Sequence, residues 1–76
     1  MFTAKDIKEL MESKPFKPFK IRMSDGSSYP IPNHDAAMIT RNFVEVGINP
    51  DADGILEKVT RCSILHITQI EELQPV

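Results

Sequence analysis

The sequence predicts a small, mainly β domain, in which one N-terminal helix precedes about five short, bent antiparallel strands. Three observations support this fold class. Helical apolar periodicity is confined to about residues 3–13. From residue 19 onward, short runs of β-forming residues alternate with turn signals about every ten residues. The chain has 76 residues, the length of one domain. We therefore expect a single domain, residues 1–76, folded as a small β-barrel, with an α+β roll as the alternative.

The helix has a clear start and a clear end. Thr3 is the expected N-cap, because Asp6 follows three residues later. Pro15 disfavours helical backbone at the residue before it, so the helix should end near Ser13. Three apolar residues at spacings of three and four form its buried stripe: Ile7, Leu10 and Met11. Two ion pairs at i,i+4 spacing are expected on its polar side: Lys5–Glu9 and Lys8–Glu12.

A perfect Lys-Pro-Phe repeat follows the helix, from Lys14 to Lys20. Prolines three residues apart favour polyproline II, so the repeat predicts a stiff connector over residues 14–18. Phe16 and Phe19 are expected to anchor this connector to the core. The same residues match P-x-x-P-x-K, a pattern that docks in aromatic grooves, although Pro-rich connectors are commoner than such ligands.

The remaining chain predicts strands separated by turns. Asp25-Gly26 is a strong hairpin signal between the first two strands. Pro30 cannot donate a ladder hydrogen bond, which places the second strand at an edge or ends it early. Asn33-His34-Asp35 is expected to form a turn, and Pro75 to end the last strand. The expected strands cover residues 19–23, 28–31, 38–40, 43–48, 55–64 and 67–73.

Composition favours a binding or assembly module. The net charge is −2, which argues against a protein with a basic face all round. The charge is uneven, since residues 1–22 carry six basic and three acidic residues, whereas residues 23–76 carry three and eight. Cys62 is the only cysteine, so no internal disulfide can support the small core. We therefore expect protein–protein assembly with self-association through an edge strand, in a cytoplasmic, reduced protein without membrane contact.

A local basic strip offers an alternative function. Lys14, Lys17, Lys20 and Arg22 would line one side of the connector and the first strand. With an exposed Phe16 stacking on bases, this strip would bind RNA or single-stranded nucleic acid. The simpler interpretation is a solvated strand face, because an alternating edge strand needs polar residues there.

Other chemistry finds little support in the sequence. Residues 49–56 match the first half of an EF-hand loop, but Thr60 occupies the position that requires a bidentate Glu. Cys62 lies in a β pattern, where a buried, inert thiol is usual, and His34 and His66 lack the spacing of a zinc site. We expect no enzymatic activity, no metal and no cofactor.

Three motifs resemble those of a group of small uncharacterised bacterial proteins: Pro15-Phe16-Lys17-Pro18-Phe19, Ser24-Asp25-Gly26 and Leu65-His66-Ile67-Thr68-Gln69-Ile70. That resemblance implies no activity. The order of one helix and five bent strands also resembles SH3-like barrels, and in particular Sm-like proteins, whose subunit rings bind RNA. Ser63-Ile64-Leu65-His66 stands where the RNA chaperones of that fold carry a Lys-His element. No binding residues are therefore transferred from them.

Overall fold

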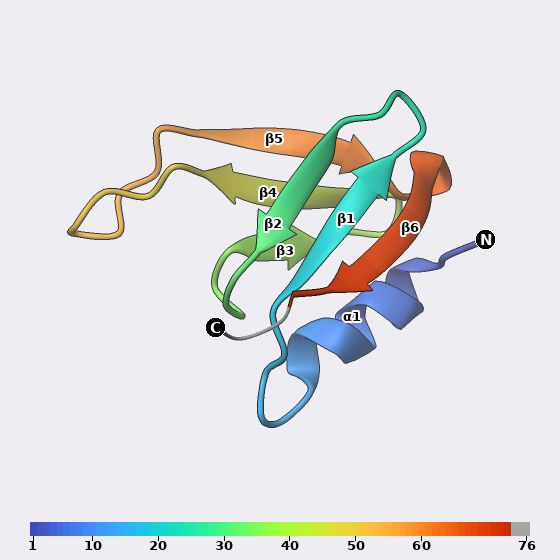
Figure 1. Cartoon of the computed structure of the whole chain (residues 1–76), viewed down its shortest axis with the longest axis horizontal. Coiled ribbons are helices and arrows are strands. Elements are labelled where there is room, and N and C mark those ends of the chain that lie inside the picture. Colours follow the sequence, from blue (N-terminus) through green and yellow to red (C-terminus); the bar gives the residue numbers. More distant parts are fainter. Residues whose placement is uncertain (74–76) are drawn as a thin grey trace.

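The computed structural model describes residues 1–73, so Pro75 lies outside the described residues. Its elements in chain order are α1 (Ala4–Glu12), β1 (Phe19–Met23), β2 (Ser28–Ile31), β3 (Ala37–Ile39), β4 (Phe43–Ile48), β5 (Lys58–Ser63), a 3-10 turn η1 (Ile64–His66) and β6 (Ile67–Glu72). The fold is mainly β with one N-terminal helix, as the sequence predicts (Figure 1).

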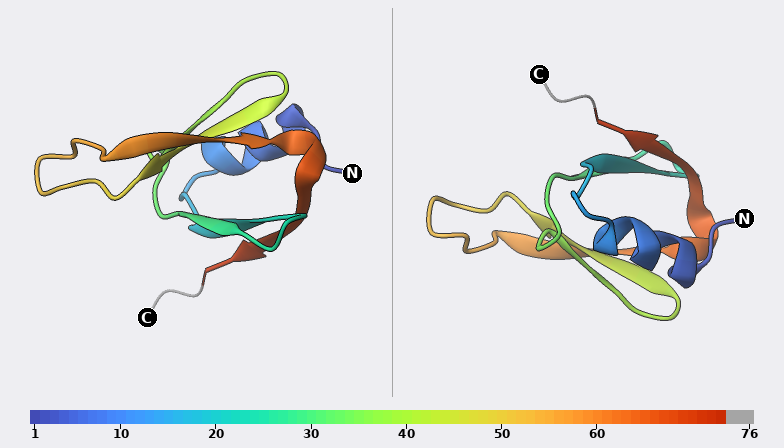
Figure 2. Two further views of the ribbon diagram at one scale, coloured as in Figure 1. Left: turned by 90° about the horizontal axis from the view of Figure 1, so that it is seen from above. Right: turned by 90° about the horizontal axis from the view of Figure 1, so that it is seen from below.

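The strands form two antiparallel sheets of three. The first sheet has the order β2-β1-β6 and the second the order β3-β4-β5. Seen edge-on, the two sheets are separate layers, and the β4–β5 hairpin projects beyond them (Figure 2). Within residues 1–73, ladder hydrogen bonds do not join the sheets into a closed barrel. The strand pairing therefore does not show the barrel that the sequence predicts.

The first strand is central rather than at an edge, which corrects the sequence-based view of its outer face. β1 pairs with β2 on one side and with β6 on the other. Its alternate residues Phe19, Ile21 and Met23 are buried, whereas Lys20 and Arg22 face outward. β2 is at the edge, as Pro30 predicts, because that edge requires no donor from the proline.

Local signals set the helix start and the first hairpin. Thr3 and Asp6 form a reciprocal capping box, with the Thr3 amide donating to Asp6 Oδ2 at 2.9 Å and the Asp6 amide donating to Thr3 Oγ1 at 3.2 Å. In the β1–β2 turn, Asp25 Oδ1 accepts from the Ser27 amide at 2.9 Å. Gly26 has φ of 91°, a conformation that favours glycine. Both predictions are confirmed.

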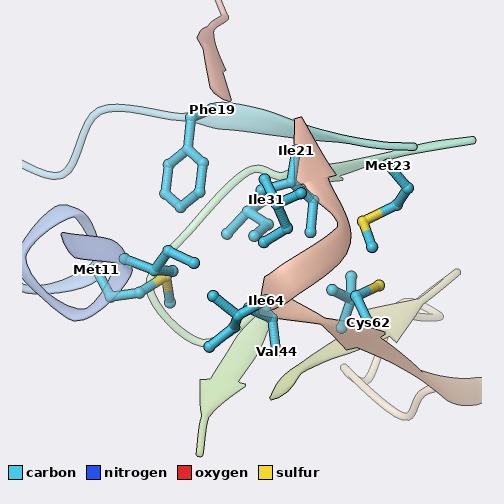
Figure 3. Packing of buried hydrophobic residues seen from close by; sticks show 11 residues of the cluster. Met11, Phe19, Ile21, Met23, Ile31, Val44, Cys62 and Ile64 are labelled. Carbon is cyan, nitrogen blue, oxygen red and sulfur yellow. The ribbon is translucent and has the colours of Figure 1, made fainter. Parts of the chain in front are cut away.

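The core fills the space between the two sheets and is closed on one side by α1. Ile7 and Met11 are the buried residues of the helix, whereas Leu10, the third member of the predicted stripe, is at the exposed margin. Phe19 of the first sheet points toward the side of the core where Met11 lies, and Val44 of the second sheet belongs to the same cluster (Figure 3). The buried cluster comprises Ile7, Met11, Phe19, Ile21, Met23, Ile31, Val44, Val46, Cys62, Ile64 and Ile67.

The Pro-rich connector reverses the chain between α1 and β1 instead of running as one straight rod (Figure 1). The backbone bends at Lys14 and Pro15, and strand β1 begins at Phe19. Phe19 is buried and Phe16 is half-buried, with their ring centroids 6.0 Å apart. The two phenylalanines therefore pin the connector to the core, as predicted.

Candidate functional surfaces

The predicted basic strip is divided by an acidic partner from β6. Lys20 Nζ lies 3.4 Å from Glu71 Oε2, and Arg22 Nη2 lies 3.3 Å from Glu71 Oε1. The register explains these contacts, because Lys20 faces Glu71 directly across the β1–β6 ladder. The hydrogen bond from Lys20, together with the charge of Arg22, lowers the pKa of Glu71 below its ordinary value. One carboxylate thus offsets part of the charge of two predicted binding residues.

The other three predicted binding residues lie on the connector. Lys14 and Lys17 are exposed, and Phe16 is half-buried. Lys14 and Phe16 line a hollow of about 420 Å³ at the end of α1, together with Met11, Glu12, Ser13 and His34. The strip therefore spans two environments, one on the connector and one on a sheet whose charges are already paired.

Two of the candidate catalytic groups, Cys62 and His66, lie at the same hollow. Cys62 is 3% exposed, and burial, with smaller effects from the charges of Glu45 and Asp25, raises the pKa of its thiol. Cys62, His66 and Asp25 are all lining residues of this hollow, which has a volume of about 310 Å³. His34 lies elsewhere, with its Nε2 atom 3.3 Å from Asp35 Oδ1. A buried thiol with a raised pKa is a poor nucleophile.

The loop that resembles half of an EF-hand uses its carboxylates for its own turns. Asp51 Oδ1 accepts hydrogen bonds from the amides of Asp53 and Ile55, both at 2.9 Å. Asn49 Nδ2 donates to Glu57 Oε2 at 3.0 Å. Among residues 1–73, no group of three or more His, Cys, Asp or Glu side chains could hold a metal ion.

The outer face of the second sheet carries exposed apolar side chains that the sequence did not single out. On edge strand β5, Val59 is 56% exposed, and on edge strand β3, Met38 is 70% exposed. Val59 pairs with Gly47 of β4, and Leu56 covers that glycine so closely that a Cβ atom there would lie 2.9 Å from its methyl groups. Ile55 adds a further exposed side chain beside Leu56 in the chain.

A polar group lies on the same sheet. Glu45 of β4 faces Met38 on one side and Arg61 on the other. Arg61 Nε donates to Glu45 Oε1 at 2.6 Å, and the guanidinium carbon lies 4.9 Å from the centroid of the Phe43 ring. The central strand is thus covered by a paired charge, whereas apolar side chains remain exposed on both edge strands.

A second basic cluster, also absent from the sequence-based predictions, joins α1 to the β3–β4 turn. Lys5 and Lys8 of the helix and Arg41 of the turn line one hollow of about 390 Å³, whose other walls are Ala4, Ile39 and Thr40. The expected pairs Lys5–Glu9 and Lys8–Glu12 are not among the ion pairs of residues 1–73. The sequence signal was weak because Arg41 is more than 30 residues from Lys8 in the chain.

Comparisons with models of protein families, with curated proteins and with solved structures find no match for this chain. No helix within residues 1–73 has the length and apolar character needed to cross a membrane.

Proposed function

We propose that the protein is a non-enzymatic assembly module that associates with further copies of itself through strand β5. The observation that carries this proposal is an unpaired strand edge beside exposed apolar side chains. β5 pairs only with β4, so its other edge offers free backbone donors and acceptors. Val59 on this strand and Leu56 just before it supply apolar area for a contact.

Charge supports a contact between two different edges of neighbouring copies. β5 carries Lys58 and Arg61, whereas β6, the edge of the other sheet, carries Glu71 and Glu72. Lys58 and Glu72 are both exposed, so they are available to a second copy. Pairing of β5 with the β6 of the next copy would place opposite charges together. Such a contact is heterologous, and it either closes a ring or extends a chain of subunits.

The proposal includes a relationship to SH3-like and Sm-like barrels. Two features support it. The single-turn helix η1 leads directly into β6, which returns to pair with β1. Only residues 32–36 separate β2 of the first sheet from β3 of the second, so the chain passes between the sheets through one short turn. The protein would then be an open member of that architecture.

The same proposal assigns no catalysis, no cofactor and a cytoplasmic location. The buried thiol of Cys62, with its raised pKa, supports the absence of nucleophilic chemistry. Nucleic-acid binding by the predicted strip is the alternative. The support for this alternative is weaker because Glu71 already pairs with Lys20 and Arg22. Lys14 and Lys17 are nevertheless exposed.

Sedimentation velocity over a range of protein concentrations tests the assembly. The wild-type chain should show a mass above that of the 8.6 kDa monomer at high micromolar concentration. Val59→Lys should shift this equilibrium toward monomer, because it places a charge in the proposed contact. Leu65→Lys is the matched control, since Leu65 is 64% exposed and lies outside β5. A wild-type chain that stays monomeric, or equal loss in both variants, would refute the proposal.

A further inference from the structure

We infer that the hollow between α1 and the β3–β4 turn binds a phosphate group. The hollow is lined by Lys5, Lys8 and Arg41, and no carboxylate is among its lining residues. None of the three cations forms an ion pair within residues 1–73. Three unpaired cations around one hollow, in a chain whose net charge is −2, form a local site for an anion.

Regular elements hold the backbone segments that carry the three cations. Lys5 and Lys8 are three residues apart on α1, so they lie on neighbouring positions of one helix face. Arg41 is the middle one of the three residues between β3 and β4. That turn is closed by the Thr40 amide, which donates to the Phe43 carbonyl at 2.9 Å, and by the Phe43 amide, which donates to Thr40 Oγ1 at 3.2 Å. The helix also packs against β3, which fixes the two segments relative to each other.

The donor set suits a phosphate better than a single carboxylate. The planar guanidinium of Arg41 can bind two oxygens of one phosphate, and each lysine ammonium adds a donor and a positive charge. A phosphate carries up to two negative charges, which three cations can balance. The Thr40 hydroxyl does not contribute, because it donates to the Phe43 carbonyl at 3.1 Å. The recognition is therefore electrostatic, with Arg41 providing the directional contact.

The remaining walls of the hollow indicate what can accompany the phosphate. Ala4 and half-buried Ile39 form an apolar part of the lining. The hollow is shallow and open to solvent, so further atoms of a ligand can extend out of it. The phosphate can belong to a phosphorylated small molecule or to a nucleic-acid backbone, and both sources share the same contacts.

A titration followed by ¹⁵N–¹H NMR tests this site in the full chain. Inorganic pyrophosphate is added at constant ionic strength, with sodium chloride as the reference titration. We expect saturable shifts of the Lys5, Lys8 and Arg41 amides with pyrophosphate only. The variants Lys8→Gln and Arg41→Gln should each weaken binding about two- to fivefold, as expected for single exposed ion pairs. Lys17→Gln, which removes an exposed lysine outside the hollow, should leave the affinity unchanged.

Two results would overturn the inference. One is a response to pyrophosphate that is no stronger than the response to chloride. The other is an equal loss of affinity in Lys17→Gln and Lys8→Gln, which would show that only the general charge matters. A parallel titration with a short single-stranded oligonucleotide identifies the source. If Arg41→Gln weakens that binding as well, the ligand is a nucleic-acid backbone, whereas binding of pyrophosphate alone points to a phosphorylated small molecule.

Discussion

The outer faces of the two sheets differ in how their side chains are partnered. On the first sheet, Lys20 and Arg22 share the carboxylate of Glu71, so the face is polar and its charges are largely offset. On the second sheet, a paired charge covers only the central strand, and Val59 and Met38 remain exposed on the edges. The comparison indicates that Lys20 and Arg22 have less free charge to offer a ligand than the sequence pattern suggests. The second sheet leaves more apolar side chains exposed to a partner.

The largest effect should come from the inner face that the two sheets share. Phe19→Ala removes the largest fully buried side chain, so we expect the free energy of unfolding to fall by about 3–5 kcal/mol. Urea denaturation monitored by circular dichroism measures this loss. Phe16→Ala is the control, and its half-buried ring should contribute less. A similar loss in both variants would mean that the connector supports the core as strongly as β1 does.

A smaller effect should distinguish the outer face of the second sheet. Gly47→Ala brings a Cβ atom to 2.9 Å from the Leu56 methyl groups and 3.3 Å from the Ala36 carbonyl oxygen. We expect a loss of about 1 kcal/mol in the free energy of unfolding, at the low end for overpacking, because the Leu56 side chain can move. The double variant Gly47→Ala, Leu56→Ala should recover part of the loss. Without recovery, the Ala36 carbonyl rather than Leu56 limits the space at this strand.

The smallest effect concerns the paired charges of the first sheet. The pKa of Glu71 is lowered in the folded chain, so its contribution to stability is present above the ordinary carboxyl pKa of about 4.3 and is lost as the pH falls through the folded value. Glu71→Gln should remove this part of the pH dependence and leave stability at pH 2 almost unchanged. Thermal unfolding of both proteins between pH 2 and 7 measures it. If the two stability curves remain parallel over this range, Glu71 does not stabilise the sheet through its charge.

Features set by neighbouring residues could be predicted from the sequence. The Thr3–Asp6 cap, the Asp25-Gly26 turn and the alternation of β1 are all local, and the structure confirms them. The first residues of β5 were placed too early, because the pattern from residue 55 does not separate an apolar loop from a strand. In the structure, Asp51 binds the Ile55 amide and holds that segment in the loop.

Features that depend on distant residues could not be predicted. The pairing of Lys20 with Glu71 needs the register of β1 with β6, and the two residues are far apart in the chain. The basic hollow likewise needs Arg41 to come beside α1. The exposure of Val59 was accessible in principle, because it is three residues from buried Cys62 and alternation therefore places it on the opposite face. To make that inference, one must know which face of β5 the core covers.

Burial of Cys62 gives the domain an internal reporter of its own opening. Its thiol is the only one in the chain and is nearly inaccessible between the two sheets. A reagent that alkylates thiols can therefore react only when the structure around β5 opens, even briefly. When reclosing is faster than alkylation, the rate of modification, divided by the rate for an exposed thiol, gives the free energy of that opening. The molecule thus carries a built-in probe of how often its two layers separate.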